Sequence, residues 1–315
     1  MMLNWNRRKI TFTILRRLLT MKEFVLLGDS TCDLSAEQRN RHNIDYIPMN
    51  YVVDGEEFVA SLDWENRSVR EFYDLMRDGK RIFTTQIPQN ICREKFLSAI
   101  EQGKDVVYIA CSSALSSSYQ TACVVARELQ AQYPDAGIYC IDSLNSSIAQ
   151  GMILLEAARL RDAGLNAGEV AAAIENCRLN FHMVGTPSTL EYLRRAGRVT
   201  ASSAFFGNLF GVKPIIISDR KGQNYAVKKV KGITNARAAI AEIIKENMTG
   251  ESRILYIGHS DAQADAEALR DEILKNASFD EVRMGIIGPI VGASVGPGLV
   301  GAFIVGKEVM IEGNS

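Results

Sequence analysis

From Met21 onward, short apolar segments alternate with segments whose apolar residues recur at helical spacing. This alternation is typical of βαβ units that build a parallel sheet. A further helix is predicted after Ser68, because Ser68 and Glu71 form a capping box. The strands and helices predicted for the first half are, in chain order, 24–27, 35–42, 106–110, 119–133, 138–141 and 148–161.

The pattern changes near residue 164, where helical and strand-like segments become interleaved less regularly. Lys221-Gly222 predicts a hairpin turn between two of the strands. We therefore predict an α/β fold with an N-terminal parallel-sheet α/β/α domain at 21–170, a second α+β domain at 171–315, and a ligand between them. The elements predicted for the second half are 167–178, 212–218, 225–230, 234–246, 253–257, 262–275 and 282–287.

Residues 1–20 carry five basic residues and no acidic one, and Met21 then opens a strand-like segment. We interpret residues 1–20 as a disordered or misassigned extension. A secretory signal is a weaker interpretation, because the apolar stretch is short and is followed by Arg16 and Arg17.

Loops rich in hydroxyl groups follow the three predicted strands of the first half, as GDST at 28–31, CSSALSSS at 111–118 and DSLNSS at 142–147. Such loops meet at the carboxyl edge of a parallel sheet, and each leads to a helix N-terminus that suits an anion. Without Lys or Arg they favour a carboxylate over a polyphosphate. A fourth polar segment, Thr84-Thr85-Gln86, precedes a helix predicted to begin near Pro88. The candidate residues of these segments are Asp29, Ser30, Thr84, Thr85, Ser112, Ser113, Ser117 and Ser118.

A plainer interpretation is that these Ser and Thr residues only cap helices, and for any single loop it is the better one. Capping alone does not account for the serine density of 111–118 or for the clustering of the loops. The combined set therefore favours a carboxylate or phosphate site.

The composition argues against several functional classes. The formal net charge of -1 gives no global field for nucleic acid or an anionic membrane. The six cysteines form no CxxC pair and indicate reduced, buried thiols, so we expect a cytoplasmic protein. The three histidines are too scattered for a local metal-ligand motif, and we expect no metal and no cofactor.

The uncharged stretch 285–306 raises the question of a membrane span, since it repeats GxxxG at Gly288, Gly292 and Gly296. Seven glycines and two prolines in these 22 residues would weaken and kink a lone spanning helix. We therefore predict a strand, a glycine-rich loop and a second strand, without stable membrane insertion.

Two motifs in this stretch match catalytic or cofactor patterns. The sequence from Gly292 to Gly296 fits GxSxG with Ser294 as nucleophile, but no histidine follows Ser294, which excludes the usual α/β-hydrolase order and leaves only an upstream histidine. GxGxxG at 296–301 leaves fourteen residues after it, too few for a dinucleotide-binding unit. We interpret both as coincidences of a glycine-rich connection.

Arg198 follows a helix stop at Gly197 and precedes the apolar segment 204–210. It could therefore lie at the mouth of an apolar pocket. Phe205, Phe206 and Leu209 are candidates for the lining of that pocket, although such aromatic clusters more often belong to the core.

Taken in order, the motifs resemble the DegV family of bacterial fatty-acid-binding proteins from about Met21 to Gly306. No single motif is decisive, but the ordered set is highly specific. The motifs are DST at 29–31 with Asp33-Leu34, TTQ at 84–86, SSALS at 112–116, Asp142-Ser143 with Gly151, LEYL at 190–193 through Gly197-Arg198, KPI at 213–215, and Gly288-Pro289 through GPG at 296–298.

The resemblance implies that a long-chain fatty acid lies in an apolar tunnel between the domains, with its carboxylate on the hydroxyl loops. It also implies that the chain is not a complete enzyme but the binding subunit of a fatty acid kinase, which presents the carboxylate to a separate ATP-using partner. Thr84 or Thr85 and Ser113 would bond the carboxylate, and Arg198 would serve partner docking or phosphoryl transfer. Ser112, Ser294 and Gly292 complete the expected site.

Two departures from the family pattern affect this expectation. The family usually has histidine where Ser294 stands, and SGT where this chain has SSS at 116–118. Serine can donate a hydrogen bond but cannot supply positive charge or shuttle a proton as imidazole does. Two alternatives stay open: a hydrolase or transferase using Ser113 or Ser294, and a regulatory module in which a lipid is only structural.

Overall fold

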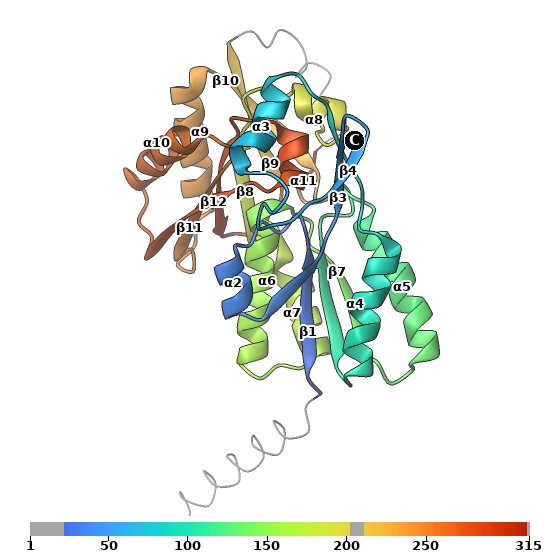
Figure 1. The fold of residues 1–315 in the computed structure, drawn as a ribbon. Helices are drawn as coiled ribbons and strands as arrows, with labels where there is room; N and C mark the ends of the chain where they lie inside the picture. The colour runs from blue at the N-terminus through green and yellow to red at the C-terminus, as the bar shows by residue number, and fades with distance from the viewer. Residues whose placement is uncertain (1–21, 202–210, 314–315) are drawn as a thin grey trace, which may run out of the picture.

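Four parallel strands form the first sheet of the computed structural model, which describes residues 22–201 and 211–313. The strands are arranged in the order β2-β1-β6-β7. This sheet lies in the lower half of Figure 1. Its strands are β1 (Phe24–Asp29), β2 (Ile44–Ile47), β6 (Asp105–Ala110) and β7 (Ile138–Asp142).

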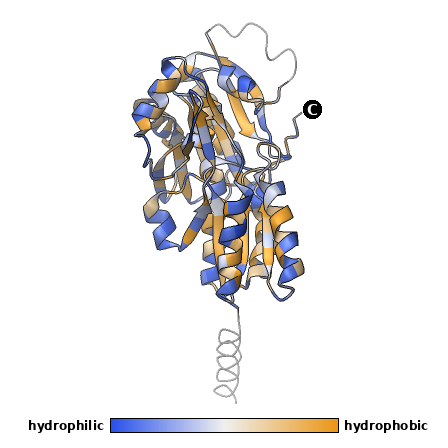
Figure 2. Cartoon of the chain, turned by 45° about the vertical axis from the view of Figure 1, so that its right-hand side comes forward, coloured by the Kyte–Doolittle hydropathy of each residue, from blue (hydrophilic) through white to orange (hydrophobic). Residues whose placement is uncertain are grey.

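Helices cover both faces of this sheet, because its strands bury side chains on both sides. Along β6, Val106 and Tyr108 pack on the α4 and α5 side, whereas Val107 and Ile109 pack on the α6 and α7 side. Figure 2 shows apolar strands enclosed by helices with polar outer faces. The helices are α2 (Ala36–Arg41), α4 (Gln89–Glu101), α5 (Ser118–Gln132), α6 (Ser147–Asp162) and α7 (Ala167–Cys177).

A small antiparallel sheet, β4-β3-β5, is inserted between β2 and α4. Its strands are β3 (Asn50–Val53), β4 (Glu56–Val59) and β5 (Ile82–Thr84), and α3 (Val69–Arg77) lies between the last two in sequence. The capping box of Ser68 and Glu71 before α3 is confirmed. The sequence analysis missed this sheet, although Asp54-Gly55, with both residues at positive φ, is a typical hairpin turn.

The second sheet has the order β10-β9-β8-β13-β11-β12, and only β11 and β12 pair in parallel. Helices α9 (Gly232–Asn247) and α10 (Gln263–Leu274) cover one face, and α6 of the first sheet packs on the other at β8 and β13. The predicted turn at Lys221-Gly222 joins β9 and β10. The strands are β8 (Phe181–Thr186), β9 (Val212–Ser218), β10 (Asn224–Lys231), β11 (Ile254–His259), β12 (Glu281–Ile286) and β13 (Val300–Val305).

The predicted fold class is confirmed: a parallel α/β/α unit is followed by a second unit with a mixed sheet. The boundary placed at 170/171 falls inside α7, which packs on β6 and β7 of the first sheet. A 3-10 turn (Arg178–Asn180) then leads into β8. The division at that residue stays a prediction, and residues 1–20 lie outside the described residues.

The glycine-rich stretch 285–306 contains the end of β12, the short helix α11 (Pro289–Val295) and β13. The expected connecting loop is therefore a helix. It begins with Gly288 as N-cap and a proline in its first turn, where proline costs no hydrogen bond. Across residues 22–201 and 211–313, no helix has the length and apolar character needed to cross a bilayer.

Candidate functional site

A cavity of about 170 Å³ lies where the carboxyl-end loops of the first sheet meet β5, α11 and the segment after α8 (Glu191–Ala196). Hydroxyl groups form one part of its lining and aliphatic side chains another. The described lining residues are Thr31, Met49, Thr84, Thr85, Gln86, Cys111, Leu115, Ser116, Ser117, Ser146, Arg198, Asn224, Ile290, Val291, Ser294 and Val295.

Thr84 and Thr85 reach the cavity because β5 ends there. Thr84 pairs with Tyr51 in the small sheet, and the Thr85 N–H donates to the Asn50 carbonyl at 2.9 Å. The Asn50 N–H donates to the Thr85 hydroxyl at 3.3 Å, which holds that side chain against β3. The Thr84 hydroxyl has no partner among the described residues and is available to a ligand.

The serine loop 112–118 turns tightly before α5, so that its later residues face the cavity. The carbonyl of Ser112 accepts the N–H groups of Leu115 and Ser116 at 2.9 and 3.0 Å. The Ser118 hydroxyl lies 2.9 Å from that of Ser116 and accepts the Ile87 N–H at 3.1 Å. Ser118 thus joins the serine loop to the threonine segment, and Ser116 and Ser117 line the cavity.

Ser112 and Ser113 lie outside the lining. Ser112 is fully buried, and its hydroxyl accepts the Ala114 N–H at 3.3 Å. It also lies against the β9–β10 turn, where a Cβ added to Gly222 would come within 2.2 Å of it. The Ser113 N–H donates to Asp142 at 3.1 Å. Both residues therefore fix the shape of the loop.

Asp29 and Ser30 are fully buried behind the cavity and hold its walls together. Asp29 accepts hydrogen bonds from the Tyr108 hydroxyl and the Cys111 N–H, both at 2.9 Å. The Ser30 hydroxyl donates to the Ala60 carbonyl at 2.7 Å and accepts the Met49 N–H at 2.8 Å. Of this predicted loop, Thr31 is the residue that lines the cavity.

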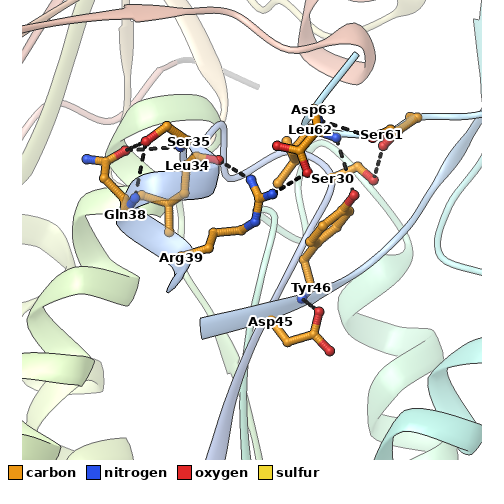
Figure 3. A network of polar contacts seen from close by, with 11 residues as sticks. Ser30, Leu34, Ser35, Gln38, Arg39, Asp45, Tyr46, Ser61, Leu62 and Asp63 are labelled. Carbon is orange, nitrogen blue, oxygen red and sulfur yellow. Dashed lines mark hydrogen bonds and ion pairs between the residues drawn. The ribbon is translucent and has the colours of Figure 1, made fainter. Parts of the chain in front are cut away.

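Figure 3 shows the surroundings of Ser30, where the end of β1 and the segment after β4 are tied together. Arg39 of α2 donates to the Leu34 carbonyl at 2.6 Å and pairs with Asp63 at 2.5 Å. The Leu62 N–H donates to the Tyr46 hydroxyl at 3.3 Å. These contacts fix the segment carrying Ala60 and therefore the position of Ser30.

Helix α11 brings Ser294 and three aliphatic residues, Ile290, Val291 and Val295, to the cavity. Gly292 is on the opposite side, where a Cβ would lie 2.4 Å from the Tyr73 hydroxyl. Glycine at 292 therefore allows α11 to pack closely on α3, and it acts on the site through that packing.

Arg198 is the one charged residue in the described lining. Its Nε donates to the Leu115 carbonyl at 3.0 Å, and its own carbonyl accepts the Asn224 amide at 2.9 Å. The side chain is exposed and also lines the cavity, so it lies at the cavity mouth. The absence of Asp and Glu from the described lining makes the cavity favourable for an anion.

Helix termini add to this preference. Ser117 and Ser146 both line the cavity and are the N-cap residues of α5 and α6, and neither makes a side-chain cap bond. The positive ends of these two long helices therefore face the cavity. Burial raises the pKa of the Cys111 thiol well above its ordinary value, so this neighbouring group stays neutral.

No group of three or more His, Cys, Asp or Glu suited to a metal ion occurs in the described ranges. Of the predicted site residues, Phe205, Phe206 and Leu209 lie outside the described residues. Pockets for drug-sized ligands measure about 300–1,000 Å³. The cavity formed by the described lining, at about 170 Å³, is smaller than that and too small for the whole of a long fatty-acid chain. The cavity accommodates a small head group and the start of a chain.

A family model described as "Uncharacterised protein, DegV family" matches residues 23–307. The chain belongs to the DegV family. A DegV domain-containing protein of Clostridium perfringens is 28% identical over 287 residues, which are 91% of this chain and 98% of the relative.

Two solved DegV structures are similar over nearly the whole chain. A fatty-acid-binding DegV family protein from Thermus thermophilus is 26% identical with a TM-score of 0.81, covering 90% of this chain and 99% of the other. A DegV lipid-binding protein from Thermotoga maritima is 25% identical with a TM-score of 0.79, covering 91% and 99%.

The sequence analysis of this DegV chain missed several lining residues. Thr31, Ser116 and Ser146 were inside the hydroxyl-rich loops but could not be separated from their neighbours, because loop geometry decides which hydroxyl faces inward. Met49 and Asn224 come from strands or turns distant in sequence and carry no motif that would single them out.

Proposed function

We propose that this DegV chain binds a long-chain fatty acid, with the carboxylate in the cavity at the carboxyl edge of the first sheet. The observation that carries the proposal is a set of four lining hydroxyls without a hydrogen-bond partner among the described residues. They are the hydroxyls of Thr84, Ser117, Ser146 and Ser294.

These hydroxyls suit a carboxylate because each can donate one hydrogen bond, and a carboxylate accepts several. Bonds to a charged acceptor are about twice as strong as neutral ones. The exposed Arg198 at the mouth and the helix N-termini add a positive electrostatic potential to the cavity. The family resemblance and the lipid-binding relatives support the same ligand class.

The first carbons of the chain would lie on the aliphatic wall formed by α11 and Leu115. Burial of apolar area contributes about 25 cal/mol per Å², so the tail supplies most of the affinity and the hydroxyls supply selectivity for an acid. The remainder of the tail requires space beyond the described lining, and the 204–210 segment is our candidate for its lining.

The direct test is denaturing mass spectrometry of the chain purified from host cells. We expect one long-chain fatty acid per chain. Finding only fatty alcohols or esters would reject the proposal. So would a chain that, after purification and incubation with a fatty acid, retains no lipid when it is washed.

We further propose that the chain presents the carboxylate to a separate ATP-using kinase subunit, which forms the acyl phosphate. This step is supported by the exposed Arg198 beside the cavity mouth and by the lack of a phosphate-binding loop in the sequence. With partner and ATP present, hydroxylamine should trap an acyl product. Arg198→Gln should retain the lipid and lose most of that product, whereas the exposed Arg195→Gln should retain both.

The serine hydrolase alternative lacks a general base in this geometry. None of the chain's three histidines lines the cavity: His182 contacts the Lys307 carbonyl at 2.6 Å and His259 accepts the Ala262 N–H at 3.2 Å. Ser113 lies outside the lining as well. Ester hydrolysis by the chain alone, lost in Ser294→Ala, would restore this alternative.

A further inference from the structure

Two cysteine side chains meet where α5 packs on the edge strand β7. Cys123 comes from α5 and Cys140 from β7, and these two elements pack together, with the Gln130 amide of α5 donating to the Ile138 carbonyl of β7 at 3.4 Å. The ionisation of each thiol responds to the other, which marks the two as neighbours. Cys140 packs with the cluster on the α5 side of the sheet, whereas the next residue, Ile141, packs on the α6 side. Strand alternation thus directs Cys140 toward α5. Both side chains are half-buried.

The surroundings of this pair distinguish its two sulfurs. Tyr119 lies one helical turn before Cys123, and Arg127, one turn after, donates to the Cys123 carbonyl at 3.2 Å. Hydrogen bonds from Cys140 and Tyr119, with the charge of Arg127, lower the pKa of Cys123 to about 6 against the opposing effect of burial. The bond to Cys123 raises the pKa of Cys140 well above its usual value.

The other four cysteines, all of which lie in the described ranges, provide a contrast. Cys32, Cys92 and Cys111 are buried, and burial raises the pKa of each thiol. Cys177 is half-buried like the pair, but burial raises its pKa to about 11. Cys123 is therefore the cysteine that combines partial access with a stabilised thiolate.

We propose that Cys123 and Cys140 form a dithiol site that hydroperoxides oxidise to a disulfide. Cys123 is the attacking thiolate and Cys140 the resolving thiol. This site is separate from the cavity and does not depend on the proposed fatty-acid ligand.

The chemistry balances with hydrogen peroxide as oxidant. The Cys123 thiolate attacks one peroxide oxygen, the O–O bond breaks, and the leaving hydroxide takes a proton to become water, which leaves a sulfenic acid. Cys140 then loses its proton and attacks the Cys123 sulfur, the S–O bond breaks, and the second hydroxide takes up that proton. Two thiols thus lose two electrons and two protons while one peroxide becomes two waters.

The site lies behind the serine loop of the cavity. Helix α5 begins at Ser118, whose hydroxyl accepts the Ile87 N–H. Strand β7 ends at Asp142, whose carboxylate accepts the Ser113 N–H. A disulfide requires an S–S distance of about 2.05 Å, shorter than a thiol hydrogen bond, so its closure draws α5 and β7 together.

The test uses the full chain with hydrogen peroxide, followed by thiol counting and peptide mass spectrometry without reductant. We expect the loss of two thiols per chain and one cross-linked peptide pair joining residues 123 and 140. Cys140→Ser should stop at a sulfenic acid on Cys123 that dimedone traps. Cys123→Ser should form neither product, and the matched control Cys177→Ser should behave as wild type.

A second measurement is independent of disulfide closure. At neutral pH, iodoacetamide should modify Cys123 about tenfold or more faster than Cys177, because a larger thiolate fraction outweighs a lower intrinsic nucleophilicity. Equal rates would overturn the role of Cys123 as the reactive thiol. A sulfenic acid that persists on Cys123 in the wild-type chain, without a cross-link, would overturn the role of Cys140.

Discussion

Two hollows lie between the two units of this DegV chain, and they differ in both size and chemistry. The cavity of about 170 Å³ has hydroxyls, one arginine and an aliphatic wall. A groove of about 1470 Å³ is lined by α2, α6, β11 and β12 and contains both acidic and basic side chains. The same chain segments face both, since Thr31 and Ser146 line the cavity while Asp33 and Ile148 line the groove.

The two hollows differ in how far their polar groups are satisfied, and not only in volume. Charged side chains of the groove are largely satisfied by local partners, as in the pairs Arg159–Glu156 and Arg283–Glu281. The cavity instead leaves hydroxyls unpartnered, and unpartnered polar groups facing a hollow require water or a ligand. These unpartnered hydroxyls are why we propose the smaller hollow as the site of the carboxylate.

The largest expected effect comes from filling the cavity. Val291→Trp places an indole in a space of about 170 Å³ and should abolish retention of a co-purified fatty acid. The matched change in the groove, Met284→Trp, should leave retention unchanged. Mass spectrometry of both purified variants measures this, and lipid loss only in Met284→Trp would transfer the site to the groove.

Removal of one hydroxyl should have the next largest effect. Thr84→Val keeps the side-chain shape and removes a donor, so the dissociation constant for a fatty acid should rise about tenfold or more. Ser113→Ala is the control, because Ser113 lies outside the lining, and its dissociation constant should match that of wild type. Titration with a fluorescent fatty acid separates the two, and the opposite ranking would favour the original prediction for Ser113.

In the groove, a pH-dependent effect on stability is expected from Asp33. Its carboxylate accepts the Ser147 hydroxyl at 2.6 Å and has its other oxygen against Gly288, where a Cβ would come within 2.3 Å. Burial raises the pKa of Asp33 to about 7, whereas the pKa of a free Asp side chain is about 3.9. The folded chain therefore keeps a proton that the unfolded chain loses between these pH values.

The consequence is that wild-type stability falls as pH rises from 4 to 7, by up to about 1.4 kcal/mol per pH unit from this group. Asp33→Asn cannot ionise, so its free energy of unfolding relative to wild type should increase over the same window. Urea denaturation at several pH values measures the difference. A difference that is constant with pH would show that Asp33 is ionised in the folded chain.

The smallest effect is expected from Ser294→His, which introduces the residue usual in the family. An imidazolium near the carboxylate should strengthen fatty acid binding a few-fold below about pH 6.5 and little above it. Wild type should have no such step from residue 294. Dissociation constants at pH 5.5 and 8 test this, and equal values for the variant at both would place residue 294 away from the carboxylate.

Much of the fold was predictable from local patterns. Apolar periodicity located β1, β6, β7 and the helices after them, and the capping box located α3. The small sheet was missed because its strands have three or four residues and little alternation. α11 was missed because glycine is a poor helix former, and only Gly288 at the N-cap and Pro289 after it favour a helix there.

The candidate site was predictable only by region. Sequence reasoning identified the threonine segment, the serine loop, Ser294 and Arg198, all of which contribute lining residues. It selected Ser112 and Ser113 rather than Ser116, since the turn that carries Leu115 and Ser116 back to the Ser112 carbonyl is not visible in composition.

The parallel sheet, the chemistry of its loops and the family could be predicted before folding was considered, because they depend on residue type and spacing along the chain. Which hydroxyls face the cavity, and which bond within the protein, depends on contacts between segments far apart in sequence and is visible only in the folded chain. Ser30 shows the difference: its hydroxyl suggested a contact with a ligand, but in the folded chain it donates to the Ala60 carbonyl and accepts the Met49 N–H.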